Sequence, residues 1–280
     1  MNIAYLGPEA SFTQLVTSQI FPYENLVSQT NILDCFYAVQ NGLVDKAVVP
    51  LENSIEGTVS MTLDYLFDFS EISIDAEAVL PISHHLMVHP NNDDFDKIYS
   101  HPQALAQTFH FRFKHYKDIP TQDFSSTAAS AKRISEHPKE RWAAIANSAA
   151  AKLYGLKIVH ENIQDFEENH TRFIVISKNK EMLEVDSLHA NHKCSLIITL
   201  PEDHAGGLHQ VLSVFAWRKM NLSKIESRTL KTGLGNYFFF INIEGDWKNN
   251  TLFKNALEEL TSIHANVRFL GAYKEYFLIA

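Results

Sequence analysis

The sequence predicts an α/β protein of two domains, and three observations indicate this fold class. In the first part of the chain, short apolar runs alternate with helical patterns, which is typical of an α/β domain with largely parallel strands. A polar stretch from Lys178 to Lys193 follows. After it the elements occur in the order β-α-β-β-α-β, which is the ferredoxin-like order. We therefore expect an α/β domain at 1–180, a linker at 181–193 and a ferredoxin-like domain at 194–280.

The individual elements follow from apolar periodicity. A helix is expected from about Asn31 to Gln40, where apolar residues share one face and Gly42 suits the C-terminal stop. In the second domain, an apolar stripe from Leu208 to Ala216 predicts the first helix. The remaining elements are strands at Asn2–Leu6, Ala47–Pro50, Ile98–Tyr99, Ala143–Ala146, Phe173–Ile176, Cys194–Leu200, Leu222–Thr229, Tyr237–Ile243 and Val267–Tyr273, and a helix at Leu252–Ile263.

Composition excludes several classes of function. The chain has 280 residues, with 24 basic and 33 acidic side chains and a formal net charge of −9, which argues against sequence-independent nucleic-acid binding. The N-terminus has no basic segment before an apolar run, so no signal peptide is expected, and no apolar stretch approaches the roughly 18 residues of a membrane span. Cys35 and Cys194 lack any partner motif, which favours a reducing, cytoplasmic setting.

One local pattern recurs in the first domain: a strand ends, small polar residues follow, and a helix begins. It occurs at Val48–Ser54, Ile98–Pro102, Phe124–Thr127 and Ala144–Ser148. For any one of these segments, simple helix capping is the plainer interpretation. Together they indicate a crevice beyond the carboxyl ends of the strands, where helix N-termini favour a small anionic or polar ligand.

Other kinds of site are not indicated. No glycine-rich nucleotide fingerprint is present, so NAD and ATP are not expected, and no G-x-S-x-G element suggests a nucleophilic serine. The histidines His84, His85 and His89 lack an H-E-x-x-H pattern and a carboxylate partner, so we interpret them as exposed or core-edge residues and expect no metal. The sequence thus predicts no cofactor.

Five segments, taken in order, carry a resemblance to a known family. The segments are Gly7–Phe12, Val49–Val59, Ser100–Gln107, Ser126–Ala129 and Asn169–Phe173, the last with a Thr-Arg-Phe signature. In this order they resemble the prephenate dehydratase family. The resemblance implies a catalytic domain of two lobes, like periplasmic solute-binding proteins, with the ligand between the lobes.

The second domain resembles an ACT domain, a sensor of small molecules. Asp203–Leu208 corresponds to a Pro-Gly-Ala-Leu loop and Ile225–Thr229 to a Glu-Ser-Arg-Pro strand end, with departures at Ala205, Gly207 and Thr229. Loss of two prolines makes both loops more flexible. The resemblance implies a homodimer or homotetramer that binds L-phenylalanine between ACT domains. The residues expected to bind it are Ala205, Gly206, Gly207, Leu208, Asn221, Glu226, Ser227 and Arg228.

The implied reaction is conversion of prephenate to phenylpyruvate, with loss of the ring hydroxyl as water and of the ring carboxylate as CO2. Aromatisation drives it, so no cofactor is needed. Two alternatives remain open, an arogenate dehydratase and a non-catalytic cytosolic amino-acid sensor.

The resemblance also implies roles for single residues. Thr171 is expected to contact the departing hydroxyl as a hydrogen-bond donor, and Glu52 is the rival acid if burial raises its pKa. Arg172 is expected to bind a carboxylate or, alternatively, to form a structural salt bridge. The catalytic candidates are Thr171, Glu52, Asn53, Ser100 and Gln107, and the substrate-binding candidates are Ser11, Phe12, Ser54, Ser126, Thr127, Arg172 and Phe173.

Overall fold

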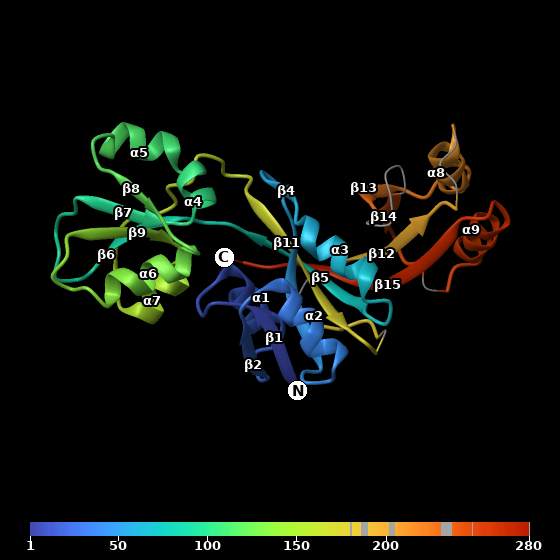
Figure 1. The fold of residues 1–280 in the computed structure, drawn as a ribbon, viewed down its shortest axis with the longest axis horizontal. Helices are drawn as coiled ribbons and strands as arrows, with labels where there is room; N and C mark the ends of the chain where they lie inside the picture. The colour runs from blue at the N-terminus through green and yellow to red at the C-terminus, as the bar shows by residue number, and fades with distance from the viewer. Residues whose placement is uncertain (180, 186–189, 202–204, 231–236, 248, 280) are drawn as a thin grey trace.

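In the computed structural model, the chain forms two lobes and a C-terminal domain arranged in a row (Figure 1). The residues that the structure describes are 1–179, 181–185, 190–201, 205–230, 237–247 and 249–279. Their strands form two sheets. A ten-stranded sheet runs through lobe 1 and the C-terminal domain, and a five-stranded sheet belongs to lobe 2.

Lobe 1 is built on the strand order β5-β11-β3-β1-β2. Apolar residues on both faces of these strands form two clusters, which explains why the central strands are apolar almost throughout. Buried Phe36 on α2 lies in one cluster and buried Val16 on α1 in the other. The elements of lobe 1 are β1 (Asn2–Leu6), α1 (Phe12–Ile20), β2 (Asn25–Gln29), α2 (Ile32–Gln40), β3 (Lys46–Asn53), β4 (Gly57–Thr58), α3 (Ser60–Asp68), β5 (Ser73–Pro81) and β11 (His170–Ser177).

Lobe 2 is inserted between β5 and β11, and its sheet has the order β10-β6-β9-β7-β8. Its two apolar clusters lie on opposite faces of this sheet: alternate β9 residues, such as Ala144 and Ala143, belong to different clusters. The elements of lobe 2 are β6 (His85–Val88), β7 (Lys97–Ser100), α4 (Pro102–Ala106), α5 (Phe109–Tyr116), β8 (Thr121–Asp123), α6 (Thr127–Ser135), β9 (Trp142–Ala146), α7 (Ser148–Tyr154) and β10 (Lys157–His160).

The expectation of largely parallel strands is only half correct. β1 pairs in parallel with β2 and β3, and β7 pairs in parallel with β8 and β9. In contrast, β11 is antiparallel to both β3 and β5, and β6 is antiparallel to β9 and β10. The reason is topological, because the chain leaves lobe 1 after β5 and must run back in the opposite direction to form β11.

The C-terminal domain has the strand order β15-β12-β14-β13, which is the ferredoxin-like topology. α8 and α9 cover one face, where they bury residues such as Phe215 and Leu260 against Leu196 and Ile241 of the strands. The elements of this domain are β12 (Ala190–Thr199), α8 (Gly207–Trp217), β13 (Leu222–Thr229), β14 (Tyr237–Glu244), α9 (Thr251–Ser262) and β15 (Asn266–Phe277).

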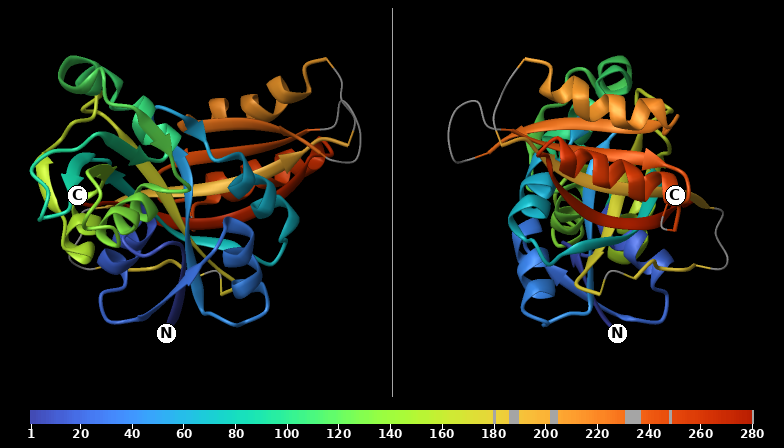
Figure 2. Two further views of the ribbon diagram at one scale, coloured as in Figure 1. Left: turned by 60° about the vertical axis from the view of Figure 1, so that its left-hand side comes forward. Right: turned by 90° about the vertical axis from the view of Figure 1, so that its right-hand side faces the viewer.

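The other face of the ferredoxin-like sheet packs against lobe 1. In Figure 2 the α3 helix lies beside the strands of this sheet. Phe238 of β14 stacks on Phe67 of α3 with ring centroids 4.7 Å apart. Arg268 of β15 donates four hydrogen bonds to backbone carbonyls at the C-terminal end of α3, those of Leu66, Phe67, Phe69 and Ile72. The carbonyls of Leu66 and Phe67 are among those that the end of α3 leaves unpaired, so Arg268 of the C-terminal domain caps this helix of lobe 1.

β15 joins the two domains into one sheet. Its last residues, Lys274–Phe277, pair in parallel with Ala76–Val79 of β5. Just before this segment, Gly271 has φ +153°, and a Cβ added to it would lie 2.2 Å from the Ile74 carbonyl oxygen. Only glycine therefore allows β15 to approach β5 this closely. β12 begins at Ala190, inside the stretch expected as a linker, part of which lies outside the described residues.

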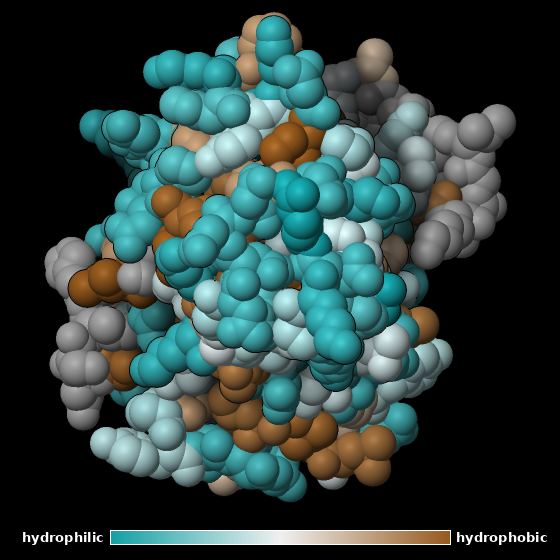
Figure 3. Space-filling view, turned by 90° about the vertical axis from the view of Figure 1, so that its left-hand side faces the viewer, coloured by the Kyte–Doolittle hydropathy of each residue, from teal (hydrophilic) through white to brown (hydrophobic). Residues whose placement is uncertain are grey.

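Each element expected from periodicity has a counterpart at the same place, with ends that differ by a few residues. The short strands β2, β4, β8 and β10 were not anticipated, nor were β5 and β6. Among the described residues, no helix has the length and apolarity required to cross a bilayer. The face of the molecule on the side of lobe 2 is largely hydrophilic, with separate apolar groups near its upper centre, its left side and its lower part (Figure 3).

Candidate active site

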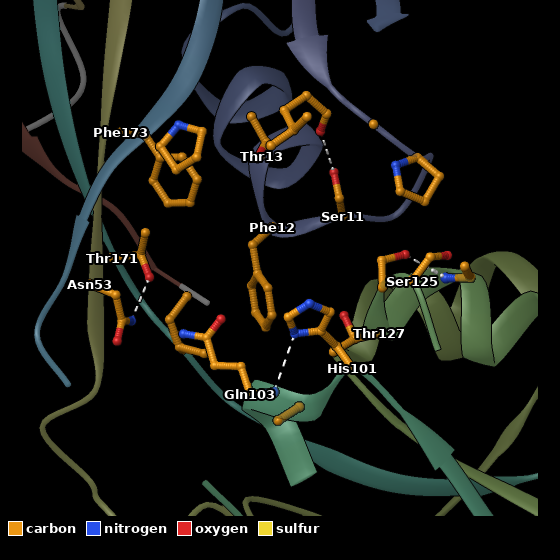
Figure 4. Close-up of a pocket in the computed structure, with 18 of the residues that line it drawn as sticks. Ser11, Phe12, Thr13, Asn53, His101, Gln103, Ser125, Thr127, Thr171 and Phe173 are labelled. Carbon is orange, nitrogen blue, oxygen red and sulfur yellow. Dashed lines mark hydrogen bonds between the residues drawn. The ribbon is translucent and has the colours of Figure 1, made fainter. Parts of the chain in front are cut away.

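A cavity of about 730 Å³ lies between the lobes, at the carboxyl ends of β1, β2 and β3 (Figure 4). Its wall combines polar side chains with a few apolar ones, among them Phe12, Ile82 and Phe173. The other lining residues are Leu6, Gly7, Pro8, Ser11, Thr13, Ser28, Gln29, Thr30, Pro50, Asn53, His84, His101, Gln103, Ala104, Gln107, Ser125, Ser126, Thr127, Ala129 and Thr171.

Helix N-termini from both lobes converge on this cavity. Ser11 caps α1 by accepting a hydrogen bond from Gln14 N at 3.2 Å, and Ser126 caps α6 by accepting one from Ala129 N at 3.0 Å. Both caps line the cavity, and no Lys or Arg is among its described lining residues. An anion bound here would therefore be held by N–H and O–H groups and helix dipoles, as the strand–cap–helix pattern predicts.

The capping pattern is wrong at one of its four positions. Val48–Ser54 leads into strand β4 instead of a helix, and α3 begins only at Ser60. At the α4 position the cap is His101, whose Nδ1 accepts from Gln103 N at 3.3 Å. Asn147 caps α7 and also donates from Nδ2 to Ala10 O of lobe 1 at 2.8 Å.

Neighbouring strands β3 and β11 contribute the centre of the site. Asn53 lies opposite Thr171 in the antiparallel register, and Glu52 lies opposite Arg172. Because side chains alternate along a strand, the two pairs face opposite sides of the sheet. Asn53 and Thr171 line the cavity, and Phe173 does so two residues farther along β11.

The carboxamide of Asn53 has one possible orientation. Its Oδ1 accepts from the backbone N–H groups of Ile55 at 3.0 Å and Glu56 at 3.1 Å, so its nitrogen must face the other way. Nδ2 donates to Thr171 Oγ1 at 2.9 Å. Thr171 therefore acts as acceptor toward Asn53, and its own hydroxyl hydrogen can donate into the cavity.

The hydrogen bonds continue from Asn53 across the cleft. Asn53 Nδ2 also donates to Asn169 Oδ1 at 2.9 Å, and Asn169 Nδ2 donates to Gln107 Oε1 at 2.9 Å. Gln107 belongs to lobe 2, at the C-cap of α4, whereas Asn53 belongs to lobe 1. Gln107 Oε1 lies 3.1 Å from His84 Nε2, and burial lowers the pKa of His84 to about 4.

Glu52 and Arg172 are not placed where the sequence interpretation had them. Glu52 accepts from Lys224 of β13 at 2.7 Å and lies 3.3 Å from Arg172 Nη1, while Arg172 Nε lies 3.6 Å from buried Glu77. Neither Glu52 nor Arg172 lines the cavity. Arg172 therefore has the position expected under the alternative interpretation, in which it forms a structural salt bridge behind Thr171.

Two predicted serines also lie outside the cavity. Ser100 is fully buried and donates from Oγ to Ile145 O at 2.6 Å, which ties β7 to β9. Ser54 donates to Glu168 O at 3.0 Å and accepts from His170 N at 2.9 Å, which ties the end of β3 to the start of β11. The predicted residues that do line the cavity are Thr171, Asn53, Gln107, Ser11, Phe12, Ser126, Thr127 and Phe173.

Several lining residues were missed by the sequence interpretation. Ser28, Gln29 and Thr30 lie at the end of β2, a strand whose short, half-exposed sequence gave no apolar signal. His84 follows β5 at the crossing between lobes, and its backbone is bonded to Gln164 Oε1 and Ile163 N of the returning segment. The rule that ligands bind beyond strand ends would have indicated Ser28 had β2 been recognised.

The residues expected to bind phenylalanine include two that contact lobe 1. Glu226 accepts from Thr58 Oγ1 at 3.0 Å, and Arg228 makes two hydrogen bonds of 3.1 Å to the Asp64 carboxylate. Ser227, between them, is exposed on the other face. Gly206 has φ +86°, as expected of the glycine before α8, whereas Asp203 of the same loop lies outside the described residues.

Metal ligation and thiol chemistry would each require a different group of side chains. No cluster of three or more His, Cys, Asp or Glu side chains there could hold a metal ion. Cys35 and Cys194 are free and buried, and burial raises the pKa of each thiol to about 12, so neither is an activated nucleophile.

Known proteins resemble the chain over nearly its whole length. The profile of the prephenate dehydratase family matches residues 3–181. Prephenate dehydratase of Bacillus subtilis is 45% identical, over 99% of this chain and 100% of that protein, and that of Lactococcus lactis subsp. lactis is 46% identical, over 99% of each. The crystal structure of prephenate dehydratase from Arthrobacter aurescens in complex with L-Phe is 34% identical, with a TM-score of 0.87 over 98% of this chain and 90% of that one. The chain belongs to the prephenate dehydratase family.

Proposed function

We propose that the protein converts prephenate to phenylpyruvate, CO2 and water in phenylalanine biosynthesis. The observation that supports this most directly is the Asn53–Thr171 hydrogen bond, which leaves a threonine O–H as a donor on the wall of an anion-suited cavity. Family membership supplies the substrate class, and the geometry supplies a group that can assist a leaving hydroxyl.

In the reaction, the C–O bond to the ring hydroxyl breaks and the oxygen leaves with a proton, as water. The bond between the ring and its carboxylate breaks at the same time, and its electron pair enters the ring as CO2 departs. One proton is consumed, and it comes from solvent. Thr171 donates a hydrogen bond to the departing oxygen and keeps its own proton. A preorganised donor of this kind contributes about 10²- to 10³-fold in rate.

Prephenate has two carboxylates and a ring, and the cavity has groups suited to the carboxylates and groups suited to the ring. The N-termini of α1 and α6, with Ser11, Ser126 and Thr127, are suited to a carboxylate. Phe12 and Phe173 offer apolar surface to the ring. Thr171 and Gln107 remain for the hydroxyl and the other polar groups.

The activity is tested directly. Purified protein should form phenylpyruvate from prephenate with no added metal or nucleotide and should keep that activity in EDTA. Turnover of arogenate alone would identify an arogenate dehydratase. Turnover of neither substrate would favour the non-catalytic amino-acid sensor.

The C-terminal domain is proposed to be an ACT domain that mediates feedback inhibition by L-phenylalanine in a homodimer or homotetramer. The support is its ferredoxin-like topology, the Glu226-Ser227-Arg228 strand and the L-Phe bound to the Arthrobacter relative. Lys224, Glu226 and Arg228 of this strand contact Glu52 of β3, Thr58 of β4 and Asp64 of α3, so the strand adjoins the lobe that carries Asn53. A cytoplasmic location fits the two free thiols.

Inhibition requires that phenylalanine bind the less active state more tightly. Millimolar phenylalanine should raise the apparent KM for prephenate or lower kcat, with a coupling of about 5- to 150-fold. Isothermal titration calorimetry should give a binding isotherm with the same midpoint. If no heat and no inhibition are observed, the domain holds the oligomer together without sensing phenylalanine.

A further inference from the structure

Two buried polar atoms at the cavity wall, Nε2 of Gln107 and Nδ1 of His84, have no hydrogen-bond partner among the residues that the structure describes. Both side chains line the cavity, and His84 is only 3% exposed. A buried polar group left unpaired costs about 1–3 kcal/mol, so such atoms in a cavity wall indicate a ligand or a functional constraint. His84 has so far entered the site only as a neighbour of Gln107.

The hydrogen bonds that start at Asn53 determine which ring nitrogen of His84 carries the proton. Two backbone N–H groups orient the Asn53 carboxamide, whose nitrogen donates to Asn169, whose nitrogen in turn donates to Gln107 Oε1. Gln107 must therefore present its oxygen to His84, and only an Nε2–H group can bond to it at 3.1 Å. With its pKa lowered to about 4 by burial, the imidazole is neutral and Nδ1 carries no proton.

Gln107 Oε1 thus accepts from two donors, Asn169 Nδ2 and His84 Nε2. Both hydrogens of Gln107 Nε2 remain without a partner in the described part of the chain. The carboxamide cannot turn over without placing N–H against N–H. The Nε2 amide group of Gln107 can therefore donate to an acceptor oxygen in the cleft. The Phe12 ring packs edge-on against His84, with centroids 5.8 Å apart, and holds the imidazole in this position.

We propose that His84 is a positioning residue for the reaction, which holds the Gln107 carboxamide so that its N–H donors face an oxygen of the substrate. The proposal rests on the dehydratase activity proposed above. His84 acts through its Nε2–H group and transfers no proton. Its backbone, bonded to the segment that returns from lobe 2, places it at the crossing between lobes, where Gln107 of lobe 2 meets Asn169.

The test uses two substitutions that differ in where they place a donor. In His84→Gln the side-chain amide reaches the position of Nε2, whereas in His84→Asn it reaches only the position of Nδ1. We expect His84→Asn and His84→Ala to lower kcat/KM for prephenate by about 10- to 100-fold, the scale of one lost buried hydrogen bond, and His84→Gln to recover most of it. Recovery by His84→Asn instead would overturn the proposal, because it would assign the role to Nδ1.

A double-mutant cycle separates positioning from packing. If His84 acts through Gln107, the variant with both His84→Ala and Gln107→Leu should be no less active than Gln107→Leu alone. Additive losses would show that His84 acts by itself and would sink the idea. Long-range ¹H–¹⁵N spectra of histidine-labelled protein, with His84 assigned by its absence in H84Q, should report the Nε2–H form at neutral pH.

The outcomes for the two proposals are distinct. A wild-type enzyme that is inactive on prephenate refutes the proposed function. A wild-type enzyme that is active, together with an H84A variant of equal kcat/KM, refutes only the role of His84.

Discussion

Replacing Thr171 with alanine is expected to lower kcat for prephenate by about 100-fold or more, while KM changes little. The hydroxyl oxygen accepts from Asn53 Nδ2 at 2.9 Å, so its hydrogen can donate into the cavity, where the proposed function puts the leaving oxygen. Negative charge grows on that oxygen only as the C–O bond breaks, so the hydrogen bond is strongest in the transition state. Steady-state kinetics of the purified variant, beside a circular dichroism spectrum, measures the effect.

Two variants serve as controls for Thr171. Thr171→Ser keeps the hydroxyl and should retain more activity than Thr171→Ala; equal losses would indicate packing by the methyl group. Glu52→Gln changes the rival acid, which pairs with Arg172 and Lys224 outside the cavity. Its pH–rate profile should keep the acid limb, and disappearance of that limb would make Glu52 the better candidate.

Replacing Asn53 with aspartate should reduce kcat at least as strongly, by about 100- to 1000-fold. A carboxylate can still accept from Ile55 and Glu56 N–H groups, but it has no hydrogen for Thr171 or Asn169. The Thr171 hydroxyl would then donate to the carboxylate instead of to the substrate. The new carboxylate and Asn169 Oδ1 would then be two buried acceptors facing each other, which should lower the free energy of unfolding by about 1–3 kcal/mol.

The pH dependence of N53D distinguishes this cause from a general loss of structure. A protonated carboxyl regains one O–H donor, so the activity of N53D relative to wild type should rise as the pH falls. A ratio that stays constant with pH would contradict the assigned direction of the hydrogen bonds. Ser54→Ala is the matched control, since the Ser54 hydroxyl bonds Glu168 O and His170 N and has no hydrogen bond with the Asn53 carboxamide, and it should remain within a few-fold of wild type.

Elements with a periodic pattern of buried apolar residues can be predicted from the sequence. Elements whose buried charges pair with residues far away in the sequence cannot. β5 was not anticipated because buried Asp75 and Glu77 interrupt its apolar pattern. Their partners are Lys46 of β3 and Lys193 of β12, which only the folded chain brings near. With β5 unrecognised, His84 at its end could not be assigned to the site.

The same reasoning explains the outcome for the site residues. Alternation along a strand requires that Glu52 and Asn53 face opposite sides, and likewise Thr171 and Arg172. The sequence does not say which side is the cavity, because that depends on where lobe 2 folds back. The family motif therefore identified the right strands but combined residues from both faces. Glu52 and Arg172 belong to the face toward the C-terminal domain.

The pairing of β15 with β5 has a consequence for how the protein is made. The two paired segments, Ala76–Val79 and Lys274–Phe277, lie about 200 residues apart in the sequence. During translation, this edge of β5 gains its partner only after residues 274–277 have left the ribosome. An unpaired strand edge is a site for association between nascent chains. A polypeptide that ends before β15 would still expose that edge even with both lobes complete, so the β5 edge is protected only in chains that include β15.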